Sequence, residues 1–95
     1  MGMNALTLAV LIAFWSRFPD AEAPLRAWYK RIRSRTYANF AEVKADFGSA
    51  DWVKGFIVFD IAGNKYRLIV EPNFQGQRFY IEAVLTHAEY DDWRA

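Results

Sequence analysis

Three strand-like runs separated by short turns fill the second half of the chain, and they limit its possible folds more than any other feature. The first run, Phe56–Ile61, is rich in aromatic and β-branched residues, which favour strands. Gly63-Asn64 predicts a turn before the run Lys65–Val70, and Gln75-Gly76 predicts another before Arg78–Leu85. Consecutive strands joined by short turns pair antiparallel, so the sequence predicts an antiparallel meander.

Side-chain alternation predicts which residues of these runs share a face of the sheet. In the middle run one face would carry Lys65, Arg67 and Ile69, and the other Tyr66, Leu68 and Val70. In the last run the two faces would carry Phe79, Ile81, Ala83 and Leu85 against Tyr80, Glu82 and Val84. Pro72 cannot donate a ladder hydrogen bond, so it predicts an edge, a bulge or a strand end.

The first half of the chain has helical patterns. Leu6–Phe18 is apolar almost all round, which predicts a buried helix with a possible short strand at its start. A second helix would open at Asp20 or Glu22, and a short third helix would run from about Phe40 to Phe47. Helices followed by strands predict an α+β fold, in which N-terminal helices pack on a three- to four-stranded antiparallel sheet and a short helix closes the chain.

Length and composition indicate one soluble domain. Ninety-five residues do not hold a second core, and a hydrophobic fraction of 54% argues against disorder. The sequence has no cysteine, which excludes disulfides and thiolate metal sites and suits a reducing cytoplasm. The run Leu6–Trp15 lacks the flanks of a signal peptide and is shorter than the roughly 20 apolar residues of a membrane span. We therefore expect a cytoplasmic protein without a membrane segment.

The charges are segregated although the net charge is only +1. Five basic residues and no acid occur in one short stretch, namely Arg26, Lys30, Arg31, Arg33 and Arg35. They fall mostly opposite the apolar helix face that carries Leu25, Trp28, Tyr29 and Ile32. A basic helix face of this kind is a candidate contact for an RNA backbone, and the alternative is that it only confers solubility.

The only histidine, His87, lies where the last strand ends. Thr86 to Glu89 match the capping box of a helix N-terminus, with Thr86 as the N-cap. His87 would then be the first helical residue, and Tyr90 would lie one turn further on. Free backbone N–H groups at a helix N-terminus favour an anion such as phosphate.

Strand pairing would bring the start of the middle strand close to the end of the last one. Lys65 and Arg67 would therefore converge with His87 and Tyr90 at one edge of the sheet. This set suits RNA cleavage without a metal or another cofactor, because cations stabilise the charged transition state and the other groups move protons. The alternatives are a structural capping histidine, a packing tyrosine and a solvated strand face.

Three stretches also resemble a known family. "FPDAEAPLRAWYK", "GNKYRLIV" and "YIEAVLTHAEYD" are similar to the HigB-type toxins of type II toxin–antitoxin systems, within the RelE/ParE superfamily, and the resemblance extends from about Phe14 to Trp93. It implies a RelE-like α+β fold and an mRNA interferase, an endoribonuclease that inhibits translation on the ribosome. It also implies a HigA-type helix-turn-helix antitoxin, with operator DNA bound only through that antitoxin.

The family motifs fall on the residues that the strand geometry selects. "GNKYR" supplies Asn64, Lys65 and Arg67, and "THAEY" supplies His87 and Tyr90. The N-terminal run is more apolar than is common in the family, and Glu71 and Asp92 replace basic residues, which would weaken attraction to RNA. Two other functions stay open: a ParE-like toxin that binds a protein target, and a non-catalytic interaction module.

Overall fold

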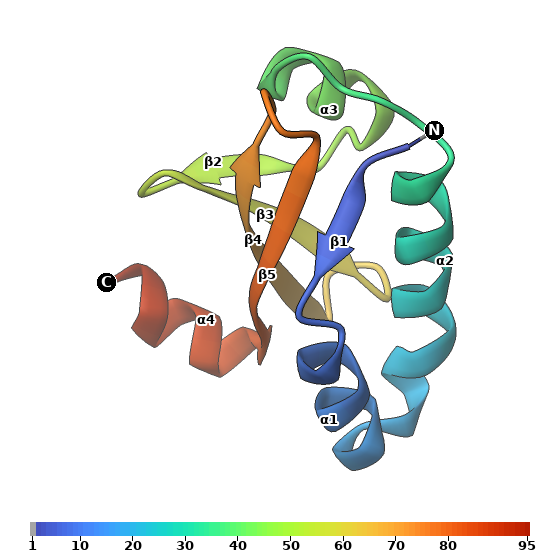
Figure 1. Cartoon of the computed structure of the whole chain (residues 1–95). Coiled ribbons are helices and arrows are strands. Elements are labelled where there is room, and N and C mark those ends of the chain that lie inside the picture. The colour runs from blue at the N-terminus through green and yellow to red at the C-terminus, as the bar shows by residue number, and fades with distance from the viewer. Residues whose placement is uncertain (1) are drawn as a thin grey trace.

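The computed structural model describes residues 2–95 as a sheet with helices on both faces (Figure 1). In chain order the elements are β1 (Asn4–Leu6), α1 (Ala9–Arg17), α2 (Glu22–Arg33), α3 (Phe40–Asp46), β2 (Asp51–Val53), β3 (Phe56–Ile61), β4 (Tyr66–Asn73), β5 (Arg78–Thr86) and α4 (His87–Arg94). A 3₁₀ turn, Pro19–Ala21, joins α1 to α2. The α+β fold and the short C-terminal helix predicted from the sequence are confirmed.

The sheet differs from the prediction in strand number and direction. Its order is β1-β5-β4-β3-β2, so five strands replace the expected three or four. The meander β3-β4-β5 is antiparallel, as predicted, but β1 pairs parallel to β5. The expectation of a purely antiparallel sheet was wrong because β1 and β2 have only three residues each, too few to show a period. Lys54 and Gly55, both at positive φ, form the tight turn between β2 and β3.

A β-bulge changes which face of the sheet the later residues of β5 point to. Ile69 pairs with Ala83, but Val70 pairs with Ile81, so one extra residue lies in β5. Beyond the bulge Val84 is buried on the same face as Ile81, which contradicts the simple alternation predicted for this strand. The alternation predicted within β4 is confirmed for the buried residues, and β4 continues through Pro72.

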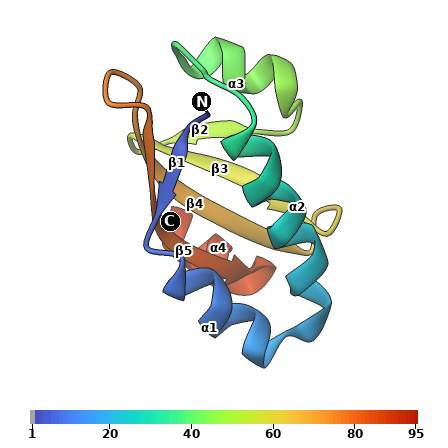
Figure 2. The same ribbon diagram turned by 45° about the vertical axis from the view of Figure 1, so that its right-hand side comes forward.

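The larger core lies between the sheet and the three N-terminal helices (Figure 2). Leu25, Trp28 and Ile32 are the buried face of α2, at the spacing that predicted it. The prediction of a buried first helix holds for one side only, because α1 buries Leu11 and Phe14 alone. No helix within residues 2–95 has the length and apolar character needed to cross a membrane.

A smaller core lies on the opposite face of the sheet, under α4. Val58, Ile69 and Tyr90 are its buried residues, and Phe56, Leu85 and Trp93 pack against them. Helix α4 therefore lies on the face that α1, α2 and α3 leave open (Figures 1 and 2). Arg67 of β4 and Tyr90 of α4, two of the predicted site residues, meet on this face.

Candidate active site

Arg67 has several contacts on the α4 face of the sheet. Its Nε lies 3.2 Å from Oδ1 of Asp60, the register partner of Arg67 on β3. Its Nη1 donates to the carbonyl oxygen of Asn64 at 2.6 Å, and its guanidinium carbon lies 5.5 Å from the centre of the Tyr90 ring. Only 12% of the side chain is exposed. Contacts from β3, from the turn before β4 and from α4 thus orient the guanidinium group.

Helix α4 brings His87 and Tyr90 to the same end of the sheet. The predicted capping box is present, since the Thr86 backbone N–H donates to Glu89 Oε1 at 2.9 Å and the Glu89 N–H donates to Thr86 Oγ1 at 3.3 Å. Because Thr86 pairs with Tyr66, the helix starts beside the start of β4. The His87 side chain is 58% exposed, and its Nδ1 lies 3.4 Å from Asp91 Oδ2. Tyr90 is buried and stacks on Trp93.

Lys65 has a different neighbourhood from Arg67. It lies in the turn before β4 and donates a hydrogen bond to Asp20, in the 3₁₀ turn of the helical layer. The Tyr66 hydroxyl donates to the same carboxylate at 2.7 Å. The hydrogen bond from Lys65 chiefly, and then that from Tyr66, lower the pKa of Asp20, and the carboxylate in turn raises the pKa of Lys65. The structure therefore brings Arg67 and Tyr90 together and engages Lys65 elsewhere.

The basic residues of α2 lie on the other layer, and several have protein partners. Arg26 contacts Glu22 at 2.7 Å, and Arg33 donates to the Tyr29 hydroxyl at 2.8 Å. Lys30 is exposed. Because α2 and α4 cover opposite faces of the sheet, the basic helix face and the Arg67–Tyr90 pair do not form one continuous surface on either layer.

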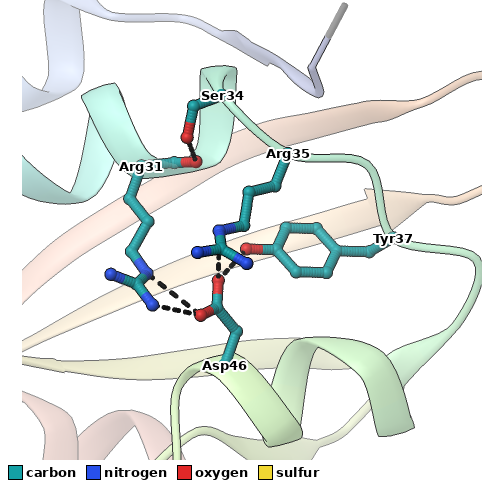
Figure 3. Close-up of polar contacts among 5 residues, drawn as sticks. All are labelled: Arg31, Ser34, Arg35, Tyr37 and Asp46. Carbon is teal, nitrogen blue, oxygen red and sulfur yellow. Dashed lines mark hydrogen bonds and ion pairs between the residues drawn. The ribbon is translucent and has the colours of Figure 1, made fainter.

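Asp46 interacts with two arginines and a tyrosine at and beyond the end of α2 (Figure 3). Its carboxylate accepts hydrogen bonds from Arg31 and from the Tyr37 hydroxyl, and it lies 3.5 Å from Nε of Arg35. The hydrogen bond from Arg31 is the main cause that lowers the pKa of Asp46, whereas burial raises the pKa of Tyr37. Ser34 Oγ donates to the Arg31 carbonyl at 2.8 Å. This Asp46 cluster joins α2 to α3 and neutralises part of the charge that the sequence assigned to RNA binding.

The sequence reasoning missed Asp20 and Asp60, which orient the two cations of the predicted site. Asp60 had a signal, because it is a lone acid inside the apolar run of β3 and faces Arg67 in the predicted meander. Asp20 had none, since its pairing with Lys65 spans 45 residues. Within residues 2–95 no three His, Asp or Glu side chains are grouped so that they could hold a metal ion.

Comparison with known proteins places the sequence in a family. Residues 21–93 match the HigB toxin family, described as the RelE-like toxic component of a toxin-antitoxin system. The mRNA interferase HigB of Escherichia coli O6:H1 is 30% identical over 78 residues, which cover 79% of this chain and 76% of that protein. The mRNA interferase toxin HigB of Escherichia coli K12 is 29% identical over 96 residues, covering 98% and 92% respectively. The same identity and coverage hold for the mRNA interferase HigB of Shigella flexneri. The resemblance predicted from the three sequence stretches is confirmed, and the chain belongs to the HigB family of RelE-like toxins.

Proposed function

We propose that this toxin is an endoribonuclease that cleaves mRNA by metal-free acid–base chemistry. The observation that carries the proposal is the guanidinium of Arg67, fixed over the Tyr90 ring beside the N-terminus of α4, where His87 is exposed. The mRNA interferase names of the E. coli relatives support the same activity.

In this reaction the 2′-oxygen of the substrate bonds to phosphorus as the bond from phosphorus to the 5′-oxygen breaks. Arg67 stabilises the extra negative charge on the phosphate, since its donors are already oriented. His87 takes the proton of the 2′-hydroxyl or supplies one to the leaving 5′-oxygen, and Tyr90 is the second proton-transfer group. Asp91, whose Oδ2 lies 3.4 Å from His87 Nδ1, orients the imidazole ring.

Lys65 and Asn64 have supporting roles in this proposal. The Asn64 carbonyl accepts from Arg67, so the turn that holds both residues also sets the position of the guanidinium. Lys65 assists at the phosphate once it leaves Asp20, its partner in this structure. In this proposal the turn also supplies an RNA contact from Asn64 and a second cation, Lys65.

The remaining contacts are proposed with ribosomal or messenger RNA and with the antitoxin. Four cations of α2 would bind the RNA backbone away from the cut bond, namely Arg26, Lys30, Arg31 and Arg33. Lys30 is the best placed of them, because the Asp46 cluster and Glu22 already engage Arg31 and Arg26. We place the protein in the cytoplasm with the ribosome, neutralised by a HigA-type helix-turn-helix antitoxin that alone contacts operator DNA.

The test is expression of the chain and of two variants, Arg67→Ala and His87→Ala, with growth and mapped mRNA 5′ ends as the measurements. We expect both variants to lose toxicity and cleavage. Arg78→Ala, an exposed arginine at the far end of β5, is the matched control and should stay toxic. Full toxicity of both site variants would refute the assigned site. Intact transcripts together with DNA damage would favour a ParE-like toxin instead.

A further inference from the structure

Two exposed apolar side chains lie next to each other on the α4 face of the sheet, outside both cores. Tyr80 on β5 and Leu6 on β1 are register partners, and each is 36% exposed. Their chain neighbours Phe79 and Ala5, also partners, are buried in the larger core, so alternation turns Tyr80 and Leu6 to the opposite face. Neither residue belongs to either hydrophobic cluster. These two side chains, the Tyr80–Leu6 patch, are thus an apolar surface open to solvent.

The patch continues the face of the sheet that carries Arg67. Alternation along β4 turns Arg67 and Glu71 to the same side, and Glu71 is the register partner of Tyr80. At a rise of about 3.3 Å per residue, the stretch from Arg67 to Glu71 spans roughly 13 Å. Helix α4 begins where β5 ends, whereas Tyr80 lies near the start of that strand (Figure 1). An RNA strand that runs along this face from Arg67 therefore reaches the patch within a few nucleotides.

A base fits the patch better than a phosphate does. Glu71 is exposed and lies across from Tyr80, so a phosphodiester group at the patch would face a carboxylate. The flat faces of a base carry no net charge, and proteins hold the unpaired bases of RNA by stacking them on aromatic side chains. Leu6 extends the apolar surface beside the Tyr80 ring. Because the patch is continuous with the face of Arg67, RNA is a better occupant than an unrelated protein segment.

We propose that Tyr80 stacks on a base of the RNA strand whose phosphate Arg67 binds, and that it forms a base subsite away from the cut bond. This inference rests on the proposed nuclease function and adds a substrate contact to it. Stacking accepts any base, so the subsite contributes affinity and holds the strand in place without requiring one base. Tyr80 lies far from the reacting atoms, so its loss should raise KM and leave kcat nearly unchanged.

The experiment measures binding of a single-stranded 2′-O-methyl RNA to the full chain by fluorescence anisotropy. This RNA has no free 2′-hydroxyl to attack phosphorus, so binding is measured without cleavage. Tyr80→Ala removes the ring, and Tyr80→Phe keeps it. Trp52→Ala is the matched control, because Trp52 is a 47% exposed aromatic on the edge strand β2 whose partner Ile57 belongs to the larger core, which places Trp52 on the other face. Circular dichroism verifies that each variant is folded.

We expect Tyr80→Ala to weaken binding about tenfold, and Tyr80→Phe and Trp52→Ala to change it less than about threefold, because the ring makes the stack and the hydroxyl does not. An abasic nucleotide placed at successive positions of the RNA then locates the contact. One position should weaken binding to the unmodified chain about tenfold and cause no further loss in Tyr80→Ala, since the two changes remove the same interaction.

Several results would overturn the base subsite: no measurable RNA binding by the unmodified chain, unchanged binding by folded Tyr80→Ala, an equal loss in Trp52→Ala, or abasic losses that are the same in both proteins. If Tyr80→Ala bound RNA normally but bound the purified product of the adjacent reading frame poorly, the patch would belong to a protein partner instead. Binding that depends on Tyr80, together with no cleavage of ordinary RNA, would count against the nuclease and still support the base subsite.

Discussion

At the scale of single residues, Asp60 determines where Arg67 points. The carboxylate lies on the neighbouring strand, 3.2 Å from Nε of Arg67, and the two residues are register partners. We expect Asp60→Asn to lower the RNA cleavage rate constant by about tenfold or more with little change in substrate affinity, because the arginine stays but is less well oriented. Steady-state kinetics on a synthetic RNA would measure the two parameters. Partial rescue by Asp60→Glu would support a positioning role, and Glu71→Gln, an exposed acid of β4, is the control.

Asp46 has a structural effect with a defined pH dependence. Its folded-state pKa is lowered, chiefly by Arg31, so the ionised carboxylate stabilises the fold above the ordinary value of 3.8, and that contribution is lost as pH falls through the lower folded-state value. We expect Asp46→Asn to reduce the free energy of unfolding by about 1–3 kcal/mol at pH 7. Urea titrations should show the difference between the two proteins shrinking below pH 4. A difference that is constant from pH 7 to pH 3, or that the exposed Asp92→Asn reproduces, would contradict this account.

At the scale of elements, α4 depends on caps at both ends. Thr86 caps its N-terminus, and Lys54 Nζ donates to the carbonyl oxygens of Trp93 and Ala95 at 2.8 and 3.3 Å. We expect Thr86→Ala to cost about 1 kcal/mol of stability. It should also lower RNA cleavage, because α4 carries His87 and Tyr90. Thermal unfolding and cleavage assays measure the two effects, Thr86→Ser should preserve both, and an unchanged melting temperature in Thr86→Ala would argue against the cap.

The elements also show what the sequence can and cannot predict. Patterns within one element located β3, the amphipathic face of α2 and the capping box of α4, since each depends on residues close in the chain. The parallel pairing of β1 with β5 was missed, because it joins residues more than 70 positions apart, such as Leu6 and Tyr80. An apolar run such as α1 has no polar stripe to show which side faces water.

In the candidate site too, contacts between neighbouring elements could be predicted from the sequence, and contacts between distant segments could not. The approach of Arg67 and Tyr90 could be predicted because it needs only one hairpin and the helix that follows it. Lys65 could not be placed correctly by alternation, because it lies in the turn before β4, where the strand period does not apply. Its partner Asp20 belongs to the helical layer, and no local pattern reports that contact.

At the scale of the whole molecule, Phe59 joins the sheet to the helical layer. The centre of its ring lies 5.4 Å from that of Trp28 on α2, 5.0 Å from that of Phe47 after α3 and 6.2 Å from that of Phe79 on β5. It is 1% exposed, so truncation would leave a cavity bordered by all three segments. Because these segments are distant in sequence, the loss should affect the entire fold at once.

We therefore expect Phe59→Ala to reduce the free energy of unfolding by about 3–5 kcal/mol, a large part of the 5–15 kcal/mol typical of such domains. Trp52→Ala, at a 47% exposed aromatic of the edge strand β2, should cost less than about 1 kcal/mol. Urea unfolding followed by tryptophan fluorescence and by circular dichroism tests both values. Coincident transitions shifted to lower urea are expected for Phe59→Ala, because the two layers share this contact. If the helical signal were lost at lower urea than the sheet signal, the layers would be separate folding units and Phe59 would not couple them.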